Sequence, residues 1–380
     1  MAEPHMTVEL ASGIMDFGFH RDTFGSTRLF ARTVFTYTGR HAQCNNQKDY
    51  LEKAIADFNA LNEGKITVVH EPQEYSGFSD KVYQAVVAGN GPDIIIDYAS
   101  TAATYVEEGD YVVDLGKYLS ADLVNTLTAG AKEEAYSFSD GKLHILPIVL
   151  SGPVLFYNPN YVETAPTTWA EVESVSKAVA QAHEGVYGFA VDSTTDVAQT
   201  MIMQLGVTLF DTKAMKAGFN TPEVVAAMEW YGRGVKEGYF LGSPTIDNYF
   251  SSDYNAGNLA MYIGSVAGAP YLTAGTWKVA EMPKTPGGVD WTPAWNRGVI
   301  VFKSNEAQEK AAAAFTEYFA SPEVNAGWCV ACNYQTALTG TMANETYKKL
   351  LADSDTLNAL EPEIAGSFPA ISATNYVRTA

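Results

Sequence analysis

The chain alternates short apolar runs of strand-like composition with segments whose apolar residues recur at helical spacing. Residues 33–37 are rich in β-branched and aromatic side chains, and residues 50–58 follow with apolar positions at the helical period. The order repeats with a strand over 65–70, a helix over 78–88 and an apolar strand over 92–97. Strands that alternate with helices predict parallel pairing and an α/β sheet.

A second α/β unit is expected to begin at residue 151. Residues 141–147 are typical of a chain leaving the first unit, and residues 154–158 form an apolar strand-like run. The helix expected near Thr168 opens with hydroxyl side chains and Glu171, which suit the free N–H groups and the dipole of a helix start. The other expected elements are helices over 198–205, 222–238 and 306–319, strands over 258–265 and 298–303, and a helix from residue 321.

The composition is that of a folded protein with about two domains. Hydrophobic residues make up 47% of the 380 residues and charged residues 18%, which is the reverse of the balance in disordered chains. At roughly 150 residues per domain, this length corresponds to two domains or slightly more. The apolar run over 311–320 is interrupted by Thr316 and Glu317 and is too short to cross a membrane. We therefore expect a soluble protein.

The charge balance argues against a nucleic acid as partner. The chain has 24 Lys and Arg residues against 44 Asp and Glu residues, a formal net charge of −20 at pH 7. Such a chain repels a phosphate backbone unless a basic patch offsets the repulsion, and the sequence shows no such patch. The acidity fits a small or neutral ligand, and it also fits many cytoplasmic enzymes.

The three cysteines do not indicate a metal or redox site. Cys329 and Cys332 form a C-x-x-C motif, but neither a second such motif nor a nearby histidine pair completes a zinc site. Their flanking residues indicate the end of a helix, where small apolar thiols pack readily. We expect Cys329 and Cys332 to be structural and Cys44 to be an unpaired surface thiol, and we assign no metal ligand and no cofactor.

Five short segments carry a resemblance to a known family. They are residues 92–95, 152–159, 166–169, 260–265 and 320–328. Their order and spacing resemble family 1 of the extracellular solute-binding proteins, which are the capture subunits of carbohydrate importers of the ATP-binding-cassette type. The family includes maltose-binding and glycerol-3-phosphate-binding proteins, and the resemblance covers residues 31–376.

The resemblance implies an α/β fold with the two lobes of a type II periplasmic binding protein. It implies that the ligand is held between the lobes by closure about a hinge and that no chemistry is done on it. The implied crossovers lie near residues 147–151, 263–268 and 303–306. The expected first lobe is 31–147 with 267–303, and the expected second lobe is 151–262 with 306–380. Residues 1–30 are expected to be an irregular leader, and relatives generally continue beyond Ala380.

The candidate ligand residues come mainly from the ends of the expected strands. Ligands of α/β sheets sit beyond the carboxyl ends of the strands. Aromatic rings match the flat C–H faces of a sugar, while Asp, Asn, Arg and Ser side chains can hydrogen-bond to its hydroxyl groups. The family resemblance marks Tyr37, Ser265 and Tyr334 as positions that face the cleft, although relatives usually have glycine where this chain has Asn333. The full candidate set is Tyr37, Thr38, Tyr75, Asp97, Tyr98, Ser100, Ser151, Gly152, Ser265, Trp295, Asn296, Arg297 and Tyr334.

Some of these positions have a structural interpretation as well. Arg297 could be ion-paired within the protein instead of recognising hydroxyl or carboxylate groups. Trp169 and Trp230 lie at helical positions and are expected in the core, because buried aromatic side chains usually pack against other apolar groups.

A neutral saccharide is the preferred ligand, and a glycerol phosphate is the alternative. Gln73, Tyr75 and the pair Ser100 and Thr101 resemble the glycerol-3-phosphate-binding subgroup. That subgroup helps to hold its phosphate with a basic residue near the C-terminal end, where this chain has Ser372. Without a guanidinium group there, a dianionic phosphate lacks its strongest bidentate partner.

Two other classes of function remain open. A glycoside hydrolase needs two carboxylates that face each other across a cleft, and Asp247 and Asp253 lie instead in an expected loop. The motifs H-E-x-x-H, G-x-S-x-G and the phosphate-binding loop are absent, so we expect a protein that is not an enzyme. A chemosensory role would use the same closure as transport. We expect a monomer outside the cytoplasmic membrane, free in a periplasm or lipid-anchored, that acts with the permease subunits of the transporter.

Overall fold

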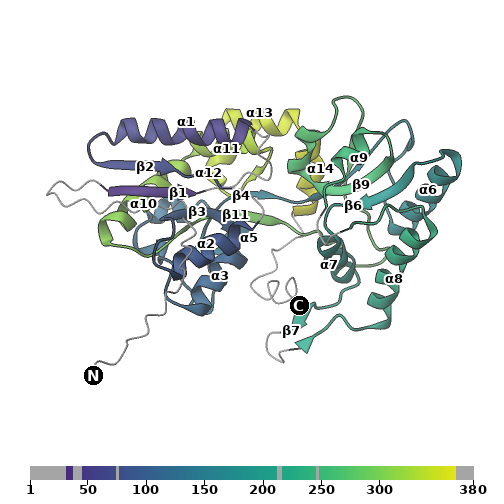
Figure 1. Cartoon of the computed structure of the whole chain (residues 1–380), viewed down its shortest axis with the longest axis horizontal. Coiled ribbons are helices and arrows are strands. Elements are labelled where there is room, and N and C mark those ends of the chain that lie inside the picture. The colour runs from purple at the N-terminus through teal and green to yellow at the C-terminus, as the bar shows by residue number, and fades with distance from the viewer. Residues whose placement is uncertain (1–30, 37–44, 74–76, 212–215, 245–247, 365–380) are drawn as a thin grey trace, which may run out of the picture.

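The protein has two α/β lobes, each built around its own sheet (Figure 1). The computed structural model describes residues 31–36, 45–73, 77–211, 216–244 and 248–364. The first sheet has the order β12 (Gln335–Thr336), β4 (Leu146–Ser151), β11 (Trp295–Val301), β3 (Ile94–Tyr98), β1 (Ala31–Thr36) and β2 (Ile66–His70). The second has the order β10 (Lys278–Ala280), β5 (Pro153–Tyr157), β9 (Leu259–Ser265) and β6 (Tyr187–Val191). The expected two-lobed α/β fold is therefore confirmed.

The first sheet is covered by helices on both faces. β1 pairs in parallel with β2 and β3, while β11 runs antiparallel to β3 and β4. Ile94 and Ile96 belong to the apolar cluster on one face and Ile95 to the cluster on the other, which explains the unbroken apolar run of this strand. The helices of the first face include α1 (Asn45–Leu61), α10 (Glu306–Phe319), α11 (Pro322–Cys332) and α13 (Glu345–Asp353), and those of the second are α2 (Phe78–Val87) and α3 (Ala99–Glu108).

The second sheet also has helices on both faces. β5 runs antiparallel to β9 and β10, and β6 is parallel to β9. The α6 helix opens with the predicted cap, in which the Thr168 hydroxyl accepts the Glu171 N–H and the Glu171 carboxylate accepts the Thr168 N–H. One face is covered by α6 (Trp169–Ala182), α7 (Thr194–Gln204) and α8 (Pro222–Glu237), and the other by α9 (Ser251–Asn255), the 3-10 helix η2 (Val266–Tyr271) and α14 (Asp355–Ile364).

Shorter elements complete the two lobes. In the second lobe, β7 (Phe210–Asp211) pairs antiparallel with β8 (Lys216–Ala217). The other short elements lie in or near the first lobe and are the 3-10 helix η1 (Leu115–Lys117), α4 (Ala121–Val124), α5 (Ala129–Ala135) and α12 (Thr339–Met342).

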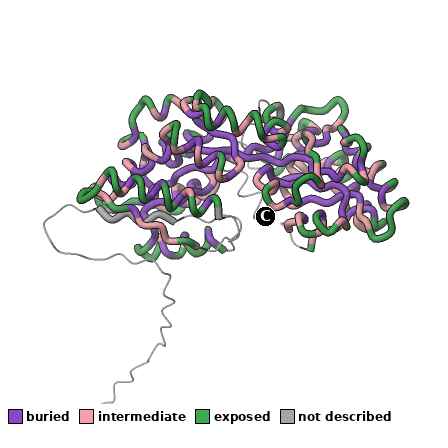
Figure 2. The backbone as a smooth tube through the Cα atoms, turned by 90° about the horizontal axis from the view of Figure 1, so that it is seen from above, coloured by how far each residue is buried: buried purple, intermediate pink, exposed green. Residues whose placement is uncertain are grey.

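The residues expected to be structural lie in the cores. Figure 2 shows buried backbone through the middle of both lobes, with exposed residues on the outer helices. Trp169 and Trp230 are buried in the second lobe with their rings 5.8 Å apart in an edge-on arrangement. Cys329 and Cys332 are buried in the first-lobe core at the end of α11, as predicted, and Cys44 lies outside the described residues.

The assignment of segments to lobes differs from the expected one after residue 262. The segment 267–303 was expected in the first lobe, but β10 pairs with β5 and belongs to the second. The segment 306–380 was expected in the second lobe, but α10 packs on β1 and α11 packs on α1, so both belong to the first. The apolar period of a helix shows that one face is buried but not which sheet it covers, and this is why the assignment was wrong.

The crossovers between the lobes move accordingly. The chain first crosses at Gly152, between β4 and β5, next to the expected 147–151. It returns between β10 and β11, not near 263–268, and leaves again at Ser354, between α13 and α14, not near 303–306. The expected leader, residues 1–30, and the chain end, residues 365–380, lie outside the described residues.

Asn333 connects the third crossover to the end of α11 and to η2. It ends α11 in the left-handed region with φ 53°, a conformation that asparagine tolerates better than most residues and that glycine adopts freely. Its Nδ2 donates to Val266 O at 2.9 Å and to Thr356 Oγ1 at 3.0 Å, while its Oδ1 accepts from Ser354 Oγ at 3.1 Å. One side chain thus holds the end of a first-lobe helix against η2 and against the third crossover.

We predict that two substitutions of Asn333 separate its conformational role from its hydrogen bonds. Asn333→Gly keeps the backbone conformation but removes the hydrogen bonds, so it should lower the free energy of unfolding by about 1–2 kcal/mol. Asn333→Ala adds left-handed strain and should cost about 1 kcal/mol more. Urea unfolding curves measure both values, and equal values for the two variants would contradict the conformational part of the argument.

Candidate ligand-binding cleft

Four of the predicted ligand residues meet where the two sheets join. Ser151 and Gly152 lie at the first crossover, where Trp295 of β11 is the neighbour of Ser151 and Ser265 of β9 is the neighbour of Pro153. A small pocket at this junction is lined by Trp295, Ser265 and Pro153. The junction therefore brings a half-buried indole ring from the first lobe next to a hydroxyl group from the second.

The second lobe completes this pocket with residues that the sequence analysis missed. Asp192 and Ser193 follow β6, Asp196 lies in the first turn of α7, and Tyr249 precedes α9. The β6 strand was not among the expected strands, so the rule that selects the ends of strands was not applied there. We call this set, with Pro153, Ser265 and Trp295, the hinge pocket.

The hinge pocket has a fixed polar wall. Asp192 Oδ1 accepts the Phe250 N–H at 3.0 Å, and the Asn248 N–H donates to the Asp192 carbonyl oxygen at 2.8 Å. Ser193 caps α7 by accepting the Asp196 N–H. A Cβ atom at Gly264 would lie 2.6 Å from Asp192 Oδ2, so the glycine in β9 leaves the room that the carboxylate occupies. The carboxylate and the helix start are thus held in place before any ligand arrives.

Asp97, Tyr98 and Arg297 form a second group on the first lobe. The Arg297 guanidinium lies 4.9 Å from the centroid of the Tyr98 ring, in the neighbouring strand. Asp97 Oδ1 accepts the Tyr98 N–H at 2.9 Å, and Ser79 donates to Oδ2 at 3.4 Å. Burial raises the pKa of Asp97, and the positive charge of Arg297 opposes this shift. Arg297 therefore acts as a charge partner within the lobe, which was the alternative interpretation of this residue.

The remaining candidates are divided between three locations. Ser100 lies half-buried in the first turn of α3, close in sequence to Asp97. Tyr334 is 5% exposed and packs with the first-lobe core, and its place facing the cleft stays a prediction. Three candidates lie outside the described residues: Tyr37, Thr38 and Tyr75.

Asn296 is buried and contacts a glutamate that was not predicted. Its side chain hydrogen-bonds to the carboxyl group of Glu134 in α5, and Glu134 is 6% exposed. Burial raises the pKa of Glu134 to about 8, more than the contact with Asn296 lowers it, so this carboxyl group is protonated at pH 7. Glu134 Oε2 has no hydrogen-bond partner within the described residues. Asn296 therefore holds a neutral acid behind the strand that carries Trp295.

The family model for bacterial extracellular solute-binding proteins matches residues 53–352. The chain belongs to this family. The predicted resemblance is therefore confirmed.

Individual relatives agree with this membership. Maltodextrin-binding protein MdxE of Bacillus subtilis is 24% identical over 278 residues, which are 70% of this chain and 64% of that protein. The match thus spans less than two thirds of that relative.

Solved structures show the same fold. Maltose-bound MalE3 of T. maritima superposes with a TM-score of 0.76 and 17% identity, covering 91% of each chain. The ABC substrate-binding protein Lmo0181 of Listeria monocytogenes, in complex with cycloalternan, superposes with a TM-score of 0.74 and 20% identity, covering 90% of this chain and 88% of that one. The correspondence extends over both lobes, because nine tenths of the chain takes part in it.

The described residues contain neither a membrane-spanning helix nor a cluster of metal-binding side chains. No described helix combines the length and the apolar character that a membrane crossing needs. Across the same ranges, His, Cys, Asp and Glu side chains do not gather in groups of three that could hold a metal ion.

We predict that Glu134 makes the stability of the protein fall as the pH rises. The folded-state pKa of about 8 lies above the ordinary value of 4.5, so the stabilisation is complete below about pH 4.5 and is lost as the pH rises through 8. Glu134→Gln replaces the protonated acid by a neutral group of the same shape. The variant should therefore gain stability over the wild type between pH 5 and pH 8, by an amount on the order of 2–4 kcal/mol.

Urea unfolding at pH 5, 6.5 and 8 measures this difference, and Glu133→Gln is the matched control. Glu133 is the exposed neighbour of Glu134 in α5, so the control should follow the wild type at all three pH values. A constant difference between Glu134→Gln and the wild type would show that Glu134 ionises as an ordinary carboxyl group.

Proposed function

We propose that this solute-binding protein captures a maltooligosaccharide between its lobes and delivers it to the permease of an ATP-binding-cassette importer outside the cytoplasmic membrane. The hinge pocket carries the proposal, because it combines an aromatic ring of one lobe with hydroxyl and carboxylate groups of the other. The names of the relatives support the sugar class, since MdxE is a maltodextrin-binding protein and MalE3 was solved with maltose. We further propose that the protein acts as a monomer and is not an enzyme.

The side chains that line the hinge pocket are of the chemical kinds that bind sugars. The Trp295 indole offers a flat apolar surface for the C–H face of a pyranose ring. Asp192 can accept hydrogen bonds from sugar hydroxyl groups, and Ser193 and Ser265 can both donate and accept them. Because Trp295 comes from the first lobe and the polar groups come from the second, a sugar that contacts both favours the closed arrangement of the lobes.

The position of the pocket supports capture by closure. Two separately packed cores are joined by three crossovers, at Gly152, between β10 and β11, and at Ser354. Two cores joined in this way can rotate as rigid bodies while a few residues at the crossovers change their torsion angles. The closed form would then be the form that the permease recognises.

A phosphate ligand is less compatible with these groups. Asp192 and Asp196 contribute two carboxylates to the hinge pocket, and the chain as a whole has a net charge of −20. A dianionic phosphate would be repelled by both the local and the overall charge. Arg297 does not reverse this, because its charge is engaged with Asp97 and Tyr98. We therefore keep a glycerol phosphate as the alternative ligand without favouring it.

We predict that Trp295→Ala weakens maltotriose binding by about 1–3 kcal/mol, which is a roughly 5- to 150-fold higher Kd. The loss follows from the missing stacking surface. The matched control is Trp277→Ala, which removes a half-buried tryptophan that packs 5.7 Å from Phe156 in the second lobe. Isothermal titration calorimetry measures both variants. Unchanged affinity in Trp295→Ala, or an equal loss in both variants, would remove Trp295 from the site.

A thermal-shift panel tests the ligand class. A ligand at about a hundred times its Kd adds about 2.7 kcal/mol to the folded state, enough to raise the Tm by several degrees. We expect shifts with maltose, maltotriose and longer maltooligosaccharides and none with glycerol 3-phosphate. A response to the phosphate alone would favour the alternative ligand over a saccharide.

A further inference from the structure

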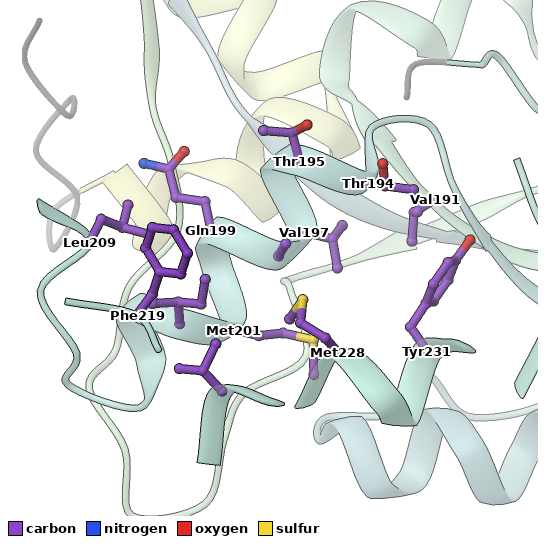
Figure 3. A pocket seen from close by; sticks show the side chains of 13 residues that line it. Val191, Thr194, Thr195, Val197, Gln199, Met201, Leu209, Phe219, Met228 and Tyr231 are labelled. Carbon is purple, nitrogen blue, oxygen red and sulfur yellow. The ribbon is translucent and has the colours of Figure 1, made fainter. Parts of the chain in front are cut away.

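The second lobe contains an apolar cavity that the proposed carbohydrate site does not use. It has a volume of about 440 Å³ and lies between α7 and α8, where thirteen side chains line it (Figure 3). Pockets that hold small molecules have volumes of about 300–1,000 Å³ and are mostly apolar. The cavity therefore has the size and the polarity of a ligand site.

The cavity and the hinge pocket lie on different sides of α7. Ser193 and Asp196 line the hinge pocket, whereas Thr194 and Thr195 line the cavity, and Val197 borders both. A sugar in the hinge pocket would therefore leave the cavity free. The cavity is a separate site in the same lobe.

The cavity separates two parts of the apolar core. Met201 and Tyr231 on one wall pack with the main cluster of the second lobe. Ile202, Leu209 and Val224 on the other wall form a separate cluster. The lining is mostly apolar, so an occupant that covers this apolar surface gains the free energy of removing it from water.

The lining residues indicate the chemistry of the occupant. None of the thirteen described side chains around the cavity is charged, which favours a neutral molecule. Figure 3 shows Met201 of α7 and Met228 of α8 pointing into the same space, and methionine sulfur makes favourable contacts with aromatic rings. Polar groups are few, and Thr194, Thr195 and Gln199 could bind one hydrogen-bonding substituent.

The depth of the cavity favours a small molecule over a protein partner. Leu209 and Val224 are buried, and so is Met201 on the opposite wall. A small molecule reaches these buried groups more readily than a helix or a loop of another protein, because α7 and α8 pack against each other there.

We propose that the cavity between α7 and α8 binds a neutral aromatic molecule of one or two rings, at a site independent of the carbohydrate. A suitable probe is 2-naphthol, which has two rings and one hydroxyl group. Isothermal titration calorimetry should show one equivalent of 2-naphthol bound per chain. In the presence of saturating maltotriose, the Kd for 2-naphthol should stay within about threefold of its value without the sugar, because the sugar site lies on the other side of α7.

Matched substitutions place the probe in the cavity. Ala198→Phe fills the space from α7 and should raise the Kd for 2-naphthol at least tenfold. Ala226→Phe makes the same change at an exposed position of α8 and should bind the probe like the wild type. Met228→Trp fills the cavity from α8 and gives the decisive result if Ala198→Phe does not fold, as judged by circular dichroism.

Several outcomes would overturn the proposal. They are the absence of 2-naphthol binding to the wild type, its displacement by maltotriose, and wild-type affinity in the folded cavity-filling variants. Tighter binding of 1-octanol than of 2-naphthol would overturn the aromatic class in favour of an alkyl ligand. A protein that binds 2-naphthol but no saccharide would contradict the proposed carbohydrate function and leave this proposal intact.

Discussion

The contact on which the rest of the cleft depends is the close approach of four chain segments at Gly152. A Cβ atom at this position would lie 2.6 Å from Leu360 Cδ1 of α14 and 3.1 Å from the carbonyl oxygen of Pro293. The Gly152 carbonyl oxygen also accepts the Val266 N–H at 3.0 Å. Since glycine is the residue that lets backbones come this close, its position brings η2, α14 and the segment before β11 against the junction of β4 and β5. The neighbours of this point are Ser151, Ser265 and Trp295, three of the residues that we propose for the ligand.

Much of the fold could be predicted because it follows from local periodicity. The apolar run at Ile94 to Ile96 is buried on both faces of its sheet, and the capped start of α6 at Thr168 follows from hydroxyl and acidic residues alone. The membership of α10 in the first lobe could not be predicted in this way. Its buried residues, such as Phe315 and Phe319, show an apolar face, but the sheet that covers this face is chosen by long-range packing.

The candidate site was predicted only in part, for related reasons. The rule that ligands lie beyond the ends of strands led to Ser151, Ser265 and Trp295, because their strands were expected from the sequence. It was not applied to Asp192 and Ser193, because β6 was not among the expected strands. The glycine in β6 is required by packing, since a Cβ atom at Gly188 would lie 2.2 Å from the Cα atom of Ser176 in α6.

The helix that follows this missed strand connects the separate parts of the second lobe. Gln204, at the last turn of α7, is fully buried, and its side-chain oxygen accepts the Trp169 Nε1–H at 2.8 Å and the Thr285 N–H at 3.0 Å. The amide nitrogen Nε2 of Gln204 donates to the carbonyl oxygen of Pro283 at 3.1 Å and to that of Trp291 at 3.3 Å. A buried amide with this many partners fixes the segments that carry them, because each lost hydrogen bond would leave a buried polar group unsatisfied.

These hydrogen bonds join α7 to the segment that returns to the first lobe. The first turn of α7 supplies Asp196 to the hinge pocket, and its last turn holds the chain between Pro283 and Trp291, a few residues before Trp295. The polar wall and the aromatic ring of the pocket come from different lobes, and α7 contributes to the polar wall and holds the chain at Trp291. In the proposed closure, the rotation between the lobes would therefore be taken up between Trp291 and Trp295 and at the other two crossovers.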